Sequence, residues 1–344
     1  MLIFRADGNS QIGAGHIMRC LAIANAAAES GIDSVFVTAS DDMKKTIESR
    51  NIVCHVMDTD YRHMEHEDII SVAEKYKPSA IIVDSYYVTE AYLKNIHKWC
   101  QANNCELVYI DDVKAWAYTC DLLINYNIYA KEADYMTLYA NEEGRAIPRM
   151  LLGASYVPLR KEFANAALKD VKQHVTDVFV STGGADPEHM ACELMKKAIT
   201  SDYIYHFVVG SMNRDKEMLK SLAKQHDNIY VYENVTDMSS LMGKCDIAVS
   251  AAGSTLYELC AMKVPTVTYV MADNQRELSE TFDGKGIIAN IGDVRIIGRE
   301  ETAGLIIDSV ETMANNYEAR CKTADRMKSI VDGRGTYRII EALQ

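Results

Sequence analysis

The stretch Arg5-Ala-Asp-Gly-Asn-Ser-Gln-Ile-Gly-Ala-Gly-His-Ile-Met-Arg-Cys20 carries the pattern on which the fold of this chain depends. An alternating apolar run leads into it, as in a strand, and apolar residues recur from Ile17 to Ala28 at the spacing of one helix face. Gly31 then stands where a helix C-terminal cap is expected. The stretch therefore predicts a strand, a polar glycine loop and a helix over residues 15–30, the opening elements of an α/β domain.

The glycine loop is suited to an anionic or hydroxyl-rich ligand. Gly13 and Gly15 allow the backbone to approach a bound molecule, and the helix N-terminus behind them offers free N–H groups and a positive dipole end. His16 stands beside that position. An ordinary strand–helix turn with a solvated or capping histidine remains an alternative at this level. Met18 replaces the third glycine of the dinucleotide fingerprint, which argues against a dehydrogenase.

The composition is that of an ordinary globular chain. Its 344 residues, 48% of them hydrophobic and 25% charged, predict two domains. A net charge of −13 argues against a nucleic-acid partner. The 9 cysteines form no C-x-x-C pair, so we expect reduced core thiols and no zinc site. No P-loop lysine motif or H-E-x-x-H motif is present, and we expect no metal or other cofactor. Without a signal-like or membrane-length apolar run, the chain is expected to be cytoplasmic.

Strands and helices alternate in both halves of the chain. The alternation pauses between residues 153 and 174 and restarts at Asp177. This predicts an N-terminal α/β domain over residues 1–165 and a C-terminal α/β domain over residues 166–344, with the last helical stretch packing back on the first domain. The expected architecture is two doubly wound, Rossmann-like domains that face each other across a cleft. The sequence leaves the oligomeric state open.

The second half contains two further strand–loop–helix turns. Gly183 and Gly184 follow a strand over residues 178–181, and Pro187 is expected at the start of the next helix. The loop from Ser250 to Thr255 offers a diphosphate cradle at a helix N-terminus, although its hydroxyl groups could serve only as caps. Glu258 could reach a ribose diol or simply favour the helix dipole.

Acidic residues end two strands of the first half. Asp84, Asp111 and Asp112 stand at strand ends, where ligands gather in open α/β sheets. By contrast, His63 and His66 lie in an acidic segment whose spacing fits no common metal site, so a solvated loop is expected there.

Several motifs, in this order along nearly the whole chain, resemble the UDP-2,4-diacetamido-2,4,6-trideoxy-β-L-altropyranose hydrolase family, the UDP-sugar hydrolases of pseudaminic acid biosynthesis. They are Arg5-x-Asp7, Gln11-Ile-Gly-x-Gly-His16-x-x-Arg19, Asp84-x-Tyr86, Asp111-Asp112 followed by Cys120-Asp-Leu-Leu-Ile-Asn125, Leu159-Arg-x-Glu-Phe163, Gly183-Gly-x-Asp186, Ser250-Ala-x-x-Ser254 with Glu258, and Asn274-Gln275. The His16 and Asn274-Gln275 motifs are the most specific.

The resemblance implies a glycosyltransferase-B-like fold, similar to that of the N-acetylglucosaminyltransferase that makes lipid II. It implies inverting, metal-independent cleavage of the C1–O bond of a UDP-linked diacetamido sugar, with water as acceptor and UDP as product. His16, Tyr86 and Asn274 correspond to the catalytic residues. The expected substrate-binding residues are Asp7, Gly13, Gly15, Arg19, Gly183, Gly184, Ser250, Gly253, Ser254, Thr255, Glu258 and Gln275.

One departure concerns Ser85, since many relatives have histidine before the tyrosine. It leaves open which sugar is recognised, and pseudaminic, legionaminic or another nonulosonic acid precursor all remain candidates. Two other functions also stay open: a UDP-sugar-dependent glycosyltransferase of the same fold, and a nucleotide-sugar-binding protein without catalytic activity.

Overall fold

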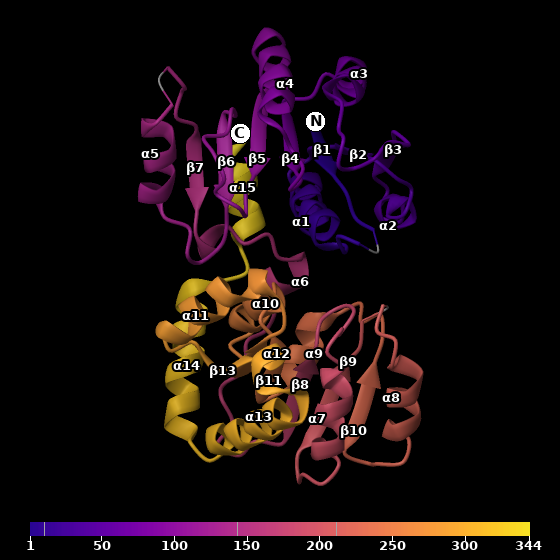
Figure 1. Cartoon of the computed structure of the whole chain (residues 1–344), viewed down its shortest axis with the longest axis vertical. Helices are drawn as coiled ribbons and strands as arrows, with labels where there is room; N and C mark the ends of the chain where they lie inside the picture. Colours follow the sequence, from indigo (N-terminus) through magenta and orange to yellow (C-terminus); the bar gives the residue numbers. More distant parts are fainter. Residues whose placement is uncertain (10, 143, 211) are drawn as a thin grey trace. The chain divides into compact units, whose positions relative to one another are not determined.

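The structure is a computed structural model that describes residues 1–9, 11–142, 144–210 and 212–344. Its contacts divide the chain into two compact units (Figure 1). The first unit combines Met1–Lys161 with Arg334–Gln344, and the second consists of Glu162–Gly333. The alternation of elements predicted one division, after residue 165; the structure has one after Lys161 and another after Gly333.

A seven-stranded sheet, parallel throughout, forms the centre of the first unit. Its spatial order is β3-β2-β1-β4-β5-β6-β7. The strands are β1 (Leu2–Ala6), β2 (Ser34–Thr38), β3 (Val53–Val56), β4 (Ala80–Asp84), β5 (Glu106–Ile110), β6 (Leu122–Asn125) and β7 (Arg149–Leu152). The central strands are almost continuously apolar because helices cover both faces of a parallel sheet.

The helices of the first unit include one from the far end of the sequence. They are α1 (Gly15–Glu29), α2 (Lys44–Glu48), α3 (His66–Tyr76), α4 (Glu90–Ala102), α5 (Glu132–Ala140), the 3₁₀ turn η1 (Ala154–Tyr156) and α15 (Gly335–Ala342). The yellow α15 packs against α1 and η1 (Figure 1). The chain passes from the first unit to the second at the start of α6 (Lys161–Ala164).

The second unit repeats the same construction with six parallel strands in the order β10-β9-β8-β11-β12-β13. They are β8 (Asp177–Ser181), β9 (Ile204–Val208), β10 (Ile229–Tyr232), β11 (Ile247–Ala251), β12 (Thr266–Val270) and β13 (Ile288–Asp293). Its helical elements are α7 (Met190–Ala198), α8 (Lys216–Ala223), α9 (Met238–Lys244), α10 (Thr255–Ala261), η2 (Asp273–Gln275), α11 (Arg276–Gly284), α12 (Val294–Ile297), α13 (Arg299–Ala314) and α14 (Tyr317–Ile330). The predicted class, two doubly wound α/β domains, is confirmed.

In each sheet, the chain first adds strands on one side of the opening strand and then adds the rest on its other side. In the first unit the chain builds outward from β1 to β3 and then returns to place β4 on the other side of β1. In the second unit β11 takes the same position beside β8. The carboxyl ends of β1 and β4, and of β8 and β11, are therefore the topological switch points of the two sheets, and we call each of them the crevice of its unit because ligands bind there in sheets of this type.

The helix expected at Pro187 begins later than the sequence suggested. It starts at Met190, and the preceding His189 has a left-handed backbone with φ of 54°. The Asp186 carboxylate accepts hydrogen bonds from the backbone N–H groups of Met190 and Ala191, both at 2.9 Å. Because this side chain satisfies the first free donors of the helix, Pro187 lies in a turn ahead of it.

None of the helices in the described ranges is long and apolar enough to cross a membrane.

We predict that Gly210→Ala destabilises the second unit. A Cβ at this position would lie 2.2 Å from the carbonyl oxygen of Gly184 and 2.5 Å from its Cα, and neither backbone atom can move without displacing the Gly183-Gly184 turn. Such overpacking should lower the free energy of unfolding by roughly 1–3 kcal/mol, measured by urea denaturation. Gly304→Ala is the control: it lies inside α13 with no atom within 4 Å of its added Cβ and should gain up to about 1 kcal/mol. Equal midpoints for the two variants would contradict the prediction.

Candidate active site

The crevice of the first unit brings His16 and Asp84 together. His16 lies in the first turn of α1, immediately after the loop that leaves β1, and Asp84 is the last residue of the adjacent β4. Gly13 gives the loop its shape, since its φ of 75° is unfavourable for any residue with a side chain. The β1–β4 pairing therefore places the predicted histidine and a strand-end carboxylate, 68 residues apart in sequence, at one point.

The contact between His16 and Asp84 fixes the state of the imidazole. Nδ1 of His16 lies 2.7 Å from Oδ1 of Asp84, whose side chain is fully buried. Nη2 of Arg19 also lies 2.9 Å from Nδ1, but the Asp84 oxygen is nearer and an ionised carboxylate can only accept, so we assign the proton to Nδ1, which donates it to Asp84. The other ring nitrogen, Nε2, is then the basic one, and the structure gives it no hydrogen-bond partner among the described residues. An orienting carboxylate on one nitrogen and a free lone pair on the other is the arrangement of a general base.

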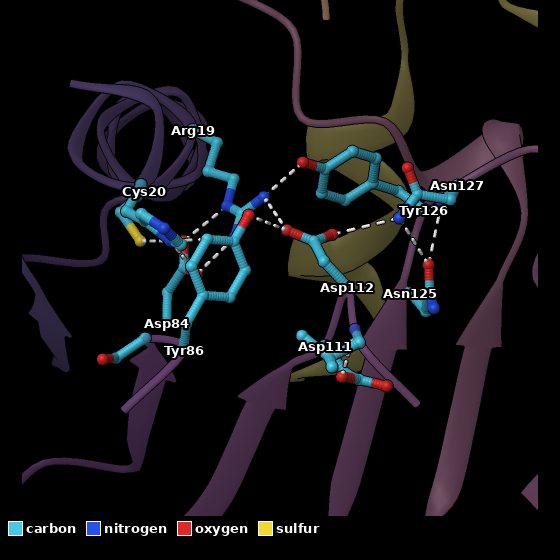
Figure 2. A network of polar contacts seen from close by, with 12 residues as sticks. Arg19, Cys20, Asp84, Tyr86, Asp111, Asp112, Asn125, Tyr126 and Asn127 are labelled. Atoms are coloured by element: carbon cyan, nitrogen blue, oxygen red, sulfur yellow. Dashed lines mark hydrogen bonds and ion pairs between the residues drawn. The ribbon is translucent and has the colours of Figure 1, made fainter. Parts of the chain in front are cut away.

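Arg19 neutralises the buried carboxylate. One turn after His16 on the same helix, its Nε donates to Oδ2 of Asp84 at 2.5 Å and its Nη2 donates to Oδ1 (Figure 2). Cys20 adds a weak thiol contact to Oδ2 at 3.5 Å. Burial by itself would raise the pKa of Asp84, but the charge of Arg19 and the contact with His16 outweigh it and hold that pKa well below its ordinary value. Asp84 therefore stays ionised and keeps the proton on Nδ1 of His16.

The same guanidinium links this pair to a second carboxylate. Nη1 of Arg19 donates to Oδ2 of Asp112 at 2.6 Å and also contacts the hydroxyl of Tyr126. Asn127 donates to the other oxygen of Asp112 at 3.0 Å. All three guanidinium nitrogens thus contact carboxylates or a phenol of the first unit, and Arg19 links the members of the network. Most of its N–H groups are therefore already used within the protein and are not available to a substrate.

Tyr86 completes the cluster. Its half-exposed ring meets the ring of His16 edge-on with 4.5 Å between centroids, and its hydroxyl donates to Oδ2 of Asp112 at 3.2 Å. Burial of the hydroxyl end and the negative charge of Asp112 raise the pKa of Tyr86 well above its ordinary value. A neutral phenol therefore lies against the general-base candidate.

Two acidic residues near this cluster have structural partners instead. Asp111 accepts the hydroxyls of Tyr118 and Tyr135 at 2.9 and 2.5 Å and the N–H of Val113 at 2.8 Å, so it anchors the loop after β5. Asp7 pairs with Arg5 at 2.6 Å and accepts the N–H of Ala39 at 2.7 Å. Gly15, the other loop glycine of the prediction, has open space around it.

The crevice of the second unit collects its predicted residues in the same way. Gly183 and Gly184 follow β8, with φ of 85° at Gly183, and Ser250 lies at the end of the adjacent β11, with Gly253 in the loop after it. Ser250 is buried, and its hydroxyl donates to the carbonyl of Ala251 at 2.9 Å. Ser254 precedes α10 but forms no side-chain cap, so its exposed hydroxyl is not used by the helix. Thr255 and Glu258 lie partly exposed on α10.

The Asn274-Gln275 pair follows β12 in the turn η2. Asn274 is exposed, whereas Oε1 of Gln275 accepts the N–H of Met271 at 3.0 Å and so closes the turn. The catalytic candidates His16 and Tyr86 belong to the first unit, and Asn274 belongs to the second.

Three members of the first-unit network were not among the expected site residues: Asp84, Asp112 and Tyr126. The two acids carried a signal, since both stand at strand ends; Tyr126 carried none. In the second unit Gly210 was missed because its close approach to Gly184 joins loops distant in sequence. Within the described ranges, three potential metal ligands come together only at Glu65, His66 and Glu67.

Comparisons with known proteins give relatives over most of the chain, although no protein-family model matches it. The UDP-2,4-diacetamido-2,4,6-trideoxy-β-L-altropyranose hydrolase of Campylobacter jejuni is 24% identical over 83% of this chain and 97% of its own. The spore coat polysaccharide biosynthesis protein SpsG of Bacillus subtilis is 22% identical over 98% of this chain and 96% of its own. The resemblance to the UDP-diacetamido-sugar hydrolases is confirmed.

An uncharacterized protein of Methanocaldococcus jannaschii is 24% identical over 80% of this chain, and the chain spans 57% of that longer relative. Among solved structures, MurG of Acinetobacter baumannii superposes with a TM-score of 0.66 at 11% identity, covering 100% of this chain and 99% of its own. The fold is therefore glycosyltransferase-B-like, as the resemblance implied.

We predict that Asp84→Asn weakens the fold at neutral pH and flattens its response to acid. A buried ion pair that loses one partner costs about 3–5 kcal/mol, here because Arg19 remains buried. The folded pKa of Asp84 lies below the unfolded one, so its stabilisation is present above about pH 4 and is lost as the pH falls through the folded pKa. Urea midpoints of wild type and variant should therefore converge in acid.

The exposed Asp227→Asn serves as control and should track the wild type throughout. Parallel curves for wild type and Asp84→Asn down to the acid limit would show that Asp84 is not the titrating group.

Proposed function

We propose that this chain hydrolyses a UDP-linked 2,4-diacetamido-2,4,6-trideoxy sugar by inverting, metal-independent cleavage at C1. The observation that carries the proposal is the pair of His16 and buried Asp84 at the crevice of the first sheet, in which Nε2 of His16 has no partner in the part of the chain that the structure describes. The named hydrolase of C. jejuni, aligned over 97% of its length, supports the substrate class. The product would be a precursor of pseudaminic or another nonulosonic acid, and the B. subtilis relative supports use in a surface polysaccharide.

The proposed reaction is a direct displacement. A water oxygen attacks C1 of the sugar from the face opposite the nucleotide, Nε2 of His16 takes a proton from that water, and the C1–O bond breaks with its electron pair passing to UDP. Asp84 stabilises the imidazolium that forms, because its charge lies 2.7 Å from Nδ1. Tyr86, held by Asp112, limits the space beside the imidazole in which the water and C1 can lie.

The second unit is proposed to hold the nucleotide. The diphosphate would meet backbone N–H groups and hydroxyls at the turn from Ser250 to Thr255, with Gly183 and Gly184 beside it at the same crevice. Glu258, one turn along α10, would accept from the ribose hydroxyls. Asn274 and Gln275 would contribute to the sugar end of the site. The leaving group is then stabilised by hydrogen-bond donors of the protein.

A glycosyltransferase remains the second candidate, because the structural neighbours carry that name. A glycosyltransferase of Rickettsia africae superposes on this chain with a TM-score of 0.61 at 12% identity, and the superposition covers 97% of that structure. The two functions differ in the acceptor. Release of UDP from the UDP-sugar without any added acceptor, with oxygen from heavy-oxygen water found on the sugar, supports hydrolysis; label absent from the sugar, or UDP release only with an acceptor hydroxyl, supports transfer.

We predict that His16→Ala lowers kcat by roughly 10² to 10⁴, the usual contribution of a positioned general base. The Kd for UDP, measured by calorimetry, should change little. His97→Ala is a matched control, since His97 also pairs with an aspartate of the first unit, Asp121 at 2.9 Å, away from the crevice. Turnover should also survive a chelator. Full activity of His16→Ala would remove His16 from the reaction, and loss with chelator that magnesium restores would contradict the metal-independent route.

We predict that Glu258→Gln reduces discrimination between UDP and 2′-deoxy-UDP. A carboxylate that accepts a ribose hydroxyl favours UDP by about 3- to 10-fold, and the neutral amide accepts more weakly. Calorimetric Kd values for both nucleotides measure the ratio. Glu280→Gln, an exposed change on α11, is the control and should leave it unchanged. An unchanged ratio in Glu258→Gln would mean that this carboxylate serves only α10.

A further inference from the structure

The segment after β3 lies across the catalytic loops of the first unit. Tyr61 contacts Gln11, in the loop after β1, and Tyr87, in the loop after β4. In the sheet order β3-β2-β1-β4, a residue that follows β3 must cross the ends of two strands to reach the loop of β4. Tyr61 therefore bridges the loop that leads to His16 and the loop that carries Tyr86.

Hydrogen bonds within the loop after β1 hold the backbone at Gln11. The Asn9 side chain accepts the N–H of Gln11 at 2.8 Å and that of Ile12 at 3.0 Å. Asn9 and Gly13 also exchange backbone hydrogen bonds of 3.2 and 2.8 Å across the loop. The backbone of Gln11 is thus held in place five residues before His16, and its side chain is exposed.

The Gln11 amide is held in one orientation. Its Oε1 accepts the hydroxyl of Tyr61 at 2.7 Å and faces Nη2 of Arg62 at 3.5 Å. Because a guanidinium can only donate, the oxygen and not the nitrogen must face this pair. Tyr61 is itself held between the Arg62 guanidinium, 5.2 Å from its ring centre, and the ring of Tyr87. The amide N–H₂ is left pointing away, with no partner among the described residues, as a donor pair.

We propose that Gln11 is a substrate-binding residue whose amide N–H donates to the carbonyl oxygen of one acetamido group of the sugar. The inference rests on the proposed function for the identity of the sugar. The two exposed N–H donors lie in the loop that leads to His16, where a bound sugar can offer acceptor oxygens in place of water, and an acetamido carbonyl is a strong neutral acceptor on such a substrate. Tyr61 and Arg62 are positioning residues that act through Gln11.

The test compares Gln11→Glu with Gln11→Ala and Tyr61→Phe. Gln11→Glu keeps an oxygen for Tyr61 and Arg62 and replaces only the N–H₂ group. For the UDP-diacetamido sugar its KM should rise about tenfold with kcat nearly unchanged, because the lost contact is made equally in the ground and transition states. Gln11→Ala should show a similar rise and Tyr61→Phe a smaller one. Gln101→Glu, an exposed change on α4, controls for the added negative charge.

Substrate analogues identify the acceptor. With the two analogues that lack one or the other acetyl group, the penalty of Gln11→Glu should disappear for one and persist for the other. A wild-type KM in Gln11→Glu, combined with defects in Gln11→Ala and Tyr61→Phe, would show that Gln11 only supports the loop and would overturn the proposal. An equal penalty on both analogues would overturn the assignment to an acetamido group.

Equilibrium binding separates this proposal from the function itself. If the wild type binds the UDP-diacetamido sugar but releases no UDP, the proposed hydrolysis fails, and a tenfold difference in calorimetric Kd between wild type and Gln11→Glu still supports the role of Gln11. Equal Kd values would overturn it. If the wild type does not bind this sugar nucleotide, both proposals fail together.

Discussion

A carboxylate buried without access to water is the constraint around which the first unit is arranged. Asp84 ends the central strand β4, and leaving its charge uncompensated would cost several kcal/mol. Arg19 and His16 supply the compensation from one face of α1, at positions three residues apart, where side chains of a helix lie side by side. The pair thereby fixes both the position of α1 over the sheet and the tautomer of the histidine.

The same network of side chains stabilises the first unit and orients the proposed general base. Arg19 extends from Asp84 to Asp112, and Asp112 in turn holds the hydroxyl of Tyr86. The neighbouring Asp111 is fully buried, and tyrosines and backbone N–H groups of its own loop are its partners. The two adjacent aspartates thus differ in role because they have different hydrogen-bond partners.

The two units use one topological device twice. In each, several residues singled out by their motifs follow the two adjacent central strands, β1 and β4 in the first unit and β8 and β11 in the second, while Asp111-Asp112 and Asn274-Gln275 follow the next strands, β5 and β12. Parallel strands that are built outward in opposite directions open a crevice at their carboxyl ends whatever their sequence. The first crevice holds a general-base candidate, and the second holds a glycine- and serine-rich turn. In the proposed hydrolysis of a UDP-sugar, the first would activate water and the second would bind the diphosphate.

The sequence by itself determined the class of fold and the position of its loops. Apolar strands alternating with amphipathic helices set two doubly wound domains, and Gly13 and Gly183 marked turns because only glycine adopts their backbone angles freely. It also singled out His16 through its motif. Only the tertiary structure decided which residues meet: the 68-residue separation of His16 and Asp84 is closed by strand pairing, and the packing of Tyr61 across the sheet end orients Gln11. These are long-range contacts, and no local pattern encodes them, because the register of strands and the path of loops over the sheet arise from packing of the whole unit.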